Sequence, residues 1–133
     1  MDIWLIANVL GRLLFSALFL RSAYNHFTQV QAMAGYARSV GHVPFPEAAV
    51  VVTGIMLLLG GLSILLGFHP RIGAALLFLF LVPVAFIMHA YWRLQDPMAK
   101  AGDAAQFWKN LALAGAALYI VANPHWPWPW AIG

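Results

Sequence analysis

The chain has 133 residues, of which 63% are hydrophobic and only 8% are Asp, Glu, Lys or Arg. An ordinary soluble domain carries about 25% charged residues, so this composition excludes a water-soluble globule and a disordered tail. The net charge of +3 arises without any basic run, which excludes nucleic acid as a partner. The sequence has no cysteine, so disulfides, thiol catalysis and thiolate metal sites are excluded. The composition is that of an integral membrane protein.

Four apolar stretches are long enough to cross a bilayer core, which requires about 20 helical residues. In chain order they cover residues 3–27, 47–68, 72–92 and 107–122. The connection at 67–71 is very short, so we expect the second and third spans to form an antiparallel hairpin. The prediction is an all-α fold, an integral membrane four-helix bundle that forms a single domain over residues 1–133.

The segment 29–46, between the first and second spans, is amphipathic and then reads Gly41-His42-Val43-Pro44-Phe45-Pro46. Two prolines and a glycine in six residues exclude a lipid-exposed helix there, because the lost amide donors would find no partner in lipid. We expect an interfacial helix followed by a cap that dips toward the bundle. Between the third and fourth spans, Asp96-Pro97 and Gly102-Asp103 predict a solvated loop.

Basic side chains are distributed unequally between the two sides of the membrane. In a four-span chain, loops one and three emerge on one side, and loop two and both termini emerge on the other. Loops one and three, with the adjoining helix ends, carry Arg21, Arg38, Arg93, Lys100 and Lys109. Loop two carries Arg71 alone. The positive-inside rule therefore predicts that loops one and three are cytoplasmic and that both termini are outside.

Arg12 lies near the middle of the first span, where inserting an arginine costs roughly 2.5–3.5 kcal/mol. At 100° per residue, one face of this helix carries Asn8, Arg12, Ser16, Phe19 and His26, which predicts a polar stripe facing the bundle interior. We expect no carboxylate at this depth, so backbone carbonyls, Asn8 or a bound anion must satisfy the guanidinium. A structural anchor and a ligand-binding residue are both open interpretations of Arg12.

Histidines near the polar side are candidates for ligand chemistry. His26, His89 and Glu47 are the conceivable metal ligands, but a metal site needs three convergent groups and we predict none. We expect His89 to hydrogen-bond Asn110 or a loop carboxylate such as Asp96. No nucleophile elbow, phosphate-binding glycine loop or zinc motif is present, so hydrolase and nucleotide chemistry lack support.

Residues 124–130 form the tail Pro-His-Trp-Pro-Trp-Pro-Trp. Alternating prolines exclude a helix, and tryptophans prefer the headgroup zone of a membrane. We therefore predict that the tail is an interfacial anchor.

Two polar motifs close the third span and open the fourth. They are His89-Ala90-Tyr91-Trp92 and Phe107-Trp108-Lys109-Asn110-Leu111-Ala112. With Gly11-Arg12-Leu13-Leu14 in the first span, they resemble the DoxX family of small bacterial inner-membrane proteins, over nearly the whole chain. The sequence departs from the family at Leu57, where members often have a glutamate, and at His26, where a lysine is common. Any charged pair formed by those two residues in relatives is lost or relocated here.

The resemblance implies a multi-pass protein of the bacterial inner (plasma) membrane with links to redox physiology, since some members are subunits of thiosulfate:quinone oxidoreductase. An apolar bundle lined by aromatic rings and a few hydrogen-bonding groups suits a quinone headgroup. We therefore expect a redox-associated subunit that binds a quinone or a similar lipophile in a polar pocket near one membrane face. The expected ligand-binding residues are Arg12, His26, His89, Trp92, Trp108, Lys109 and Asn110.

The partners expected are the lipid bilayer, a membrane or peripheral redox protein and further copies of the chain. The sequence does not decide whether the protein is itself an enzyme. The alternative function is a non-catalytic membrane scaffold or chaperone that docks a partner protein, which is how distant eukaryotic relatives act. In that case the polar cluster holds the loops in place and presents a docking face.

Overall fold

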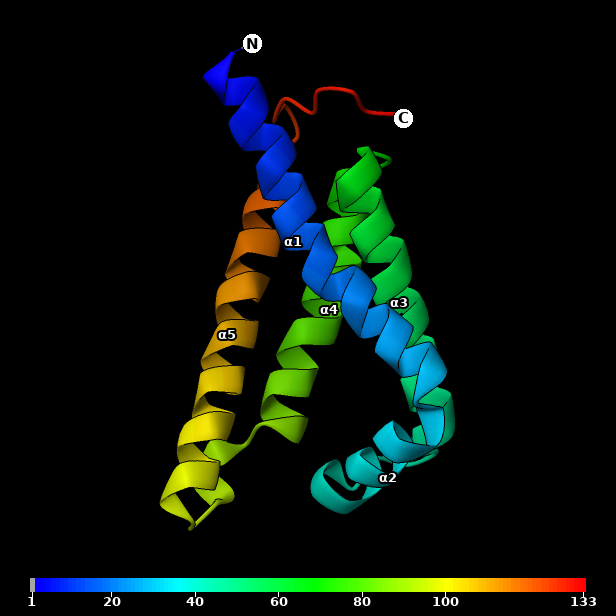
Figure 1. Ribbon diagram of the computed structural model, residues 1–133, viewed down its shortest axis with the longest axis vertical. Coiled ribbons are helices and arrows are strands. Elements are labelled where there is room, and N and C mark those ends of the chain that lie inside the picture. The colour runs from blue at the N-terminus through cyan, green and yellow to red at the C-terminus, as the bar shows by residue number, and fades with distance from the viewer. Residues whose placement is uncertain (1) are drawn as a thin grey trace.

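Helices account for nearly all of the chain in the computed structural model, which describes residues 2–133. The elements are α1 (Ile3–Thr28), α2 (Val30–Gly41), α3 (Pro46–Leu66), α4 (Pro70–Met88), the short 3-10 helix η1 (Tyr91–Arg93) and α5 (Pro97–Ala122). No strand occurs in this range, so the all-α prediction is confirmed. In Figure 1, α2 lies at the lower end of the molecule, next to the ends of α1 and α3, and the start of α1 and the C-terminal tail lie at the opposite end.

Three helices are long and apolar enough to cross a membrane, namely α1, α3 and the segment Pro70–Arg93 that contains α4. They correspond to the first three predicted spans. The fourth predicted span lies in α5, which is 26 residues long but polar in its first half. Among the described residues α5 does not meet the same criteria of length and apolar composition, so three of the four predicted spans are confirmed.

The bounds of the last two spans differ from the prediction. The α-helix of α4 ends at Met88 rather than at Trp92, because His89 leaves the helical conformation and the chain then tightens into η1. α5 begins at Pro97, well before the predicted start at 107. The carboxylate of Asp96 accepts a hydrogen bond from the N–H of Ala99 at 2.9 Å, and proline suits the first turn because its missing N–H would have no partner there. The expected solvated loop is therefore a capped helix start.

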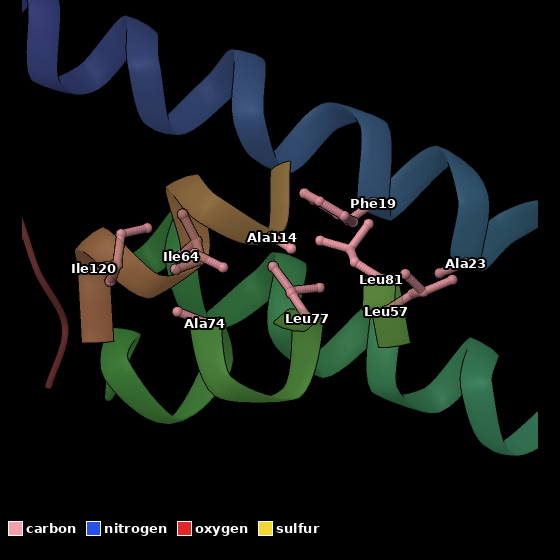
Figure 2. Packing of buried hydrophobic residues seen from close by; sticks show 10 residues of the cluster. Phe19, Ala23, Leu57, Ile64, Ala74, Leu77, Leu81, Ala114 and Ile120 are labelled. Carbon is pink, nitrogen blue, oxygen red and sulfur yellow. The ribbon is translucent and has the colours of Figure 1, made fainter. Parts of the chain in front are cut away.

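The core lies where all four long helices meet, as Figure 2 shows. Its largest buried side chains are Phe19, Leu57, Ile64, Leu77 and Leu81, which are at most 2% exposed. Neighbouring pairs α1–α3, α3–α4 and α4–α5 pack together, but no Cα atom of α1 lies within 8 Å of one in α5 anywhere in the described chain. The four long helices therefore share one core, but α1 and α5 do not pack backbone to backbone. Only side chains fill the space between these two helices.

The C-terminal end of α3 is capped by segments that are remote in sequence. A helix leaves its last four carbonyls without intrahelical partners. Here the carbonyl of Ser63 accepts from the N–H groups of Gly67 and Phe68. The carbonyl of Ile64 accepts from the indole N–H of Trp128 at 3.2 Å, and that of Leu65 accepts from Arg12 at 2.8 Å. The carbonyl of Leu66 accepts from the N–H of Ile132 at 3.0 Å. All four carbonyls are satisfied, so the tail is a structural cap. Its contact with lipid headgroups stays a prediction.

Gly67 links this cap to the turn that follows α3. Its φ of +70° is in the left-handed region that favours glycine at a helix end. A Cβ at this position would lie 2.7 Å from the Cβ of Ala131 and would also clash with the ring of Trp128. The position therefore needs glycine for its backbone conformation and for the close approach of the tail.

Candidate functional site

A cavity of about 370 Å³ lies at the end of the molecule that carries α2. Its wall includes side chains from all five α-helices, and most of them are apolar. Toward this end α1 and α5 diverge in Figure 1. The volume is within the range of about 300–1,000 Å³ that is usual for small-molecule sites. Four of the predicted ligand-binding residues line it, namely His26, His89, Lys109 and Asn110.

His26 enters the cavity wall from the last turn of α1 and is 7% exposed. Its Nδ1 lies 2.9 Å from the carbonyl oxygen of Val50 and 3.1 Å from the hydroxyl of Thr53. Because a carbonyl oxygen only accepts, we assign the proton of the neutral ring to Nδ1, which leaves Nε2 as an acceptor. Gly54 permits the approach, since a Cβ there would lie 2.9 Å from the Cβ of His26.

His89 follows the last residue of α4 and pairs with a carboxylate of α5. Its Nδ1 lies 3.2 Å from Oδ1 of Asp103, and the two side chains are 18% and 22% exposed. The prediction that a carboxylate pairs with His89 is confirmed, but the carboxylate is that of Asp103. Asp96, which we had named as an example, instead caps the start of α5. Asp103 was missed because Gly102-Asp103 was interpreted as a helix breaker. The start signal at Asp96-Pro97 could have placed Asp103 on the same helix face as Phe107 and Asn110.

Asn110 is the most informative polar residue of the cavity. It is 6% exposed, and within residues 2–133 its side-chain amide makes no hydrogen bond, so the predicted bond from His89 is absent. Its amide atoms are not among the buried polar atoms without a partner, so they open onto the cavity and are free to bond a group inside it. Its neighbour Lys109 is exposed and donates to Oε1 of Gln106 at 2.5 Å.

The cavity is biased toward positive and neutral groups. No Asp or Glu side chain lines it, and its titratable lining residues are His26, Tyr36, His89 and Lys109. Tyr36 of α2 was not predicted, because the sequence gives no signal of how α2 folds against α3. Burial raises the pKa of Tyr36, and the negative charge of Asp103 raises it further. Nowhere in the described chain do three His, Asp or Glu side chains group as metal ligands would.

Three predicted site residues lie outside this cavity. Arg12 is at the other end of the molecule, where it donates to the carbonyls of Leu65 and Pro129 and its guanidinium lies 5.5 Å from the ring centre of Trp128. Backbone carbonyls, one of the predicted options, accept from its two terminal nitrogens, whereas its buried Nε has no partner in the described chain. Arg12 is 14 residues from His26, which is about 21 Å along a helix. The expected convergence of Arg12 with the other site residues is thus wrong.

Trp92 and Trp108 form part of an aromatic cluster on the outer surface. Their ring centres lie 5.4 Å and 5.2 Å from that of Phe107, and they are 47% and 59% exposed. Both rings meet Phe107 edge to face, Trp92 also contacts Phe86 of α4, and neither tryptophan lines the cavity. The polar signature of the third and fourth spans is therefore divided: His89, Lys109 and Asn110 line the cavity, and the two tryptophans do not.

Comparison with known proteins gives the family of the chain. Residues 7–90 match the DoxX family model, which is more than half of the chain. The chain belongs to the DoxX family. It is similar to inner membrane protein YphA of Escherichia coli (strain K12), with 33% identity over 85 residues that cover 64% of this chain and 59% of YphA. The chain thus spans less than two thirds of that relative's length. No solved structure matches it.

The family match divides the candidate site. It begins at residue 7, within α1, and ends at Ala90 after α4, so it includes His26 and His89. It stops before α5, which supplies Asp103, Lys109 and Asn110. Leu57, where family members often carry a glutamate, is fully buried in the core and does not line the cavity.

Proposed function

We propose that this DoxX-family protein resides in the bacterial inner membrane and binds a quinone or a similar lipophile in the cavity, as a redox-associated subunit. The observation that carries the proposal is the amide of Asn110, which makes no hydrogen bond within residues 2–133 and lines a cavity whose wall is mostly apolar. Apolar side chains suit a ring and its tail, while the amide and the nearby ammonium of Lys109 suit an oxygen on the ring. The name of YphA and the three apolar helices support the location.

A short-chain ubiquinone analogue tests this proposal on the purified protein in detergent. A ligand at about 100 times its dissociation constant stabilises the folded state by about 2.7 kcal/mol, so the melting temperature is expected to rise by several degrees. Asn110→Leu should weaken binding by about tenfold, because it removes one hydrogen bond to the ring oxygen.

The matched control for that variant is Asn25→Leu. Asn25 lies on α1 beside His26, makes no side-chain hydrogen bond in the described chain and does not line the cavity. Asn25→Leu should therefore bind like the unaltered protein. No change in melting temperature on addition of the quinone, or equal affinity of both leucine variants, would contradict the proposal.

We also infer that α5 is the fourth span, so that the chain is a four-helix membrane bundle. Two contacts align α5 with the whole length of α4. At one end Nε of Arg71 donates to the carbonyl of Val121 at 2.8 Å, and at the other His89 pairs with Asp103. The two helices therefore run antiparallel over the same depth, and a membrane crossed by α4 is also crossed by α5. The excess of basic residues in loops one and three supports a cytoplasmic location for those loops.

Single cysteines test this topology, because the natural chain has none. The reagent is a membrane-impermeant maleimide, added to intact spheroplasts, whose inner membrane is accessible from outside. Met98→Cys, at an 84% exposed position at the start of α5, is expected not to react. Ile132→Cys, 66% exposed beyond the end of α5, should react. Phe45→Cys, 82% exposed in loop one, serves as the control that should behave like Met98→Cys. Equal labelling at positions 98 and 132 would show that α5 does not span.

The exposed aromatic surface favours a second candidate function. Trp92, Trp108 and Met98 present large apolar area outside the cavity and at the same end of the molecule. A non-catalytic scaffold that docks a partner protein would use such a surface. Tryptophans at a membrane interface have the same exposure, which is why the cavity carries the first proposal.

A further inference from the structure

The two histidines of the cavity have the same assigned tautomer. Nδ1 of His26 faces the carbonyl of Val50, and Nδ1 of His89 faces the carboxylate of Asp103. Both partners accept hydrogen bonds, so in each neutral ring the proton is on Nδ1 and Nε2 is the acceptor. No side chain or backbone group within residues 2–133 donates to either Nε2. The imidazoles therefore cannot donate to a quinone carbonyl while they are neutral.

His89 also has the surroundings of a proton acceptor. Asp103 lies 3.2 Å from its Nδ1 and is not part of the cavity wall. His89 lines the cavity and its Nδ1 is taken by Asp103, so Nε2 is the ring nitrogen left for a ligand. A carboxylate hydrogen-bonded to Nδ1–H holds the imidazole in one tautomer and stabilises the imidazolium that forms when Nε2 takes a proton. Asp103 is thus a positioning residue for His89.

We propose that the cavity selects a ligand whose head carries a hydroxyl donor, a phenol or the reduced, quinol form of a quinone, and that His89 accepts the hydroxyl proton. This inference deepens the proposed function and rests on it. In the step, the O–H bond of the ligand breaks and an N–H bond forms at Nε2. The ligand becomes a phenolate and His89 an imidazolium, so charge is conserved and no electron is transferred.

The other charges around the cavity favour the phenolate. The groups that share its wall with His89 are His26 from α1, Tyr36 from α2, and Lys109 and Asn110 from α5. Lys109, whose Nζ donates to Oε1 of Gln106, adds a positive charge to the wall that favours the anion, and the amide of Asn110 can donate to it. Neither α3 nor α4 contributes an ionisable lining side chain among the described residues, so no carboxylate within the wall repels the anion.

Two probes of the same shape separate this inference from the proposed function. 4-Nitrophenol has the donor hydroxyl and an absorbance band specific to its phenolate, whereas 4-nitroanisole carries a methyl ether in place of the hydroxyl. In titrations of the purified protein we expect 4-nitrophenol to bind at least about tenfold more tightly, as a charge-assisted hydrogen bond implies. Binding should also enrich the phenolate band and so lower the apparent pKa of the probe.

Variants locate the proton acceptor. Asp103→Asn keeps a hydrogen-bond acceptor beside Nδ1 but removes the negative charge, so it should bind 4-nitrophenol without enriching the phenolate band. His89→Gln should lose both the enrichment and the preference over 4-nitroanisole. His125→Gln, at an exposed position of the tail, is the matched control and should behave as the unaltered protein.

The outcomes are distinct. Equal binding of the two probes by the unaltered protein would overturn the inference and would still be consistent with a lipophile-binding cavity. This comparison does not depend on whether any variant folds. Enrichment of the phenolate that persists in His89→Gln would overturn the assignment of the acceptor. If neither these probes nor the ubiquinone analogue binds, both the inference and the proposed function fail.

Discussion

Arg12→Ala is expected to destabilise the fold by about 3 kcal/mol, because it leaves the carbonyl of Leu65 at the end of α3 and that of Pro129 in the tail without their charged donor. The substitution also removes the cation–π contact between the guanidinium of Arg12 and the ring of Trp128. Unfolding in mixed micelles, followed by the fluorescence of the six tryptophans, gives the free energy of unfolding.

Arg21→Ala is the matched control for this prediction. Arg21 is on the same helix, is exposed, and makes no side-chain hydrogen bond within the described residues. Its replacement should change the free energy of unfolding by no more than about 0.5 kcal/mol. Equal effects of the two substitutions would contradict the capping role of Arg12. Quinone affinity of the folded Arg12→Ala protein should be unchanged, because the cavity is at the other end of the molecule.

The faces of the helices could be predicted from the sequence, whereas their relative depth could not. The face of α1 that carries Arg12, Ser16, Phe19 and His26 is buried as predicted, because helical periodicity is a local property. The depth of Arg12 depends on how far α1 extends beyond α3. Figure 1 shows α1 crossing the other helices obliquely and projecting past them at its N-terminal end. Arg12 is consequently level with the end of α3 rather than with the middle of the bundle.

Site residues whose position follows from the end of a single helix could be predicted from the sequence. Contacts between two segments that are distant in the sequence were missed. His26 and His89 end their helices on the same side, so chain topology alone brings them together. The pairing of His89 with Asp103 requires α5 to begin at Pro97, and that start was hidden by an interpretation of Asp-Pro as a break. The tail was missed as a cap because the bond from Trp128 to Ile64 joins residues 64 positions apart. Such contacts leave no periodic signal in a single sequence.

Val84→Phe is expected to abolish most ligand binding without weakening the fold. Val84 is a half-buried residue of α4 that lines the cavity, and a benzyl side chain there occupies the space in which the ligand ring would lie. Filling a cavity with apolar atoms commonly adds about 0.5–2 kcal/mol of stability. We therefore expect the affinity for the ubiquinone analogue to fall by at least about tenfold, the loss of more than one kcal/mol of binding free energy, while the melting temperature of the ligand-free protein stays constant or rises.

Val52→Phe is the control for that change. Val52 lies on α3, is 56% exposed and does not line the cavity, so the same added ring should leave binding intact. Opposite shifts in stability and affinity for Val84→Phe are a signature that general destabilisation cannot produce, because an unfolding protein loses both together. If Val84→Phe binds the quinone as tightly as Val52→Phe does, the ligand occupies another surface. The exposed aromatic cluster of Trp92 and Trp108 would then be the place to look for it, since it is the part of the predicted site that the cavity excludes.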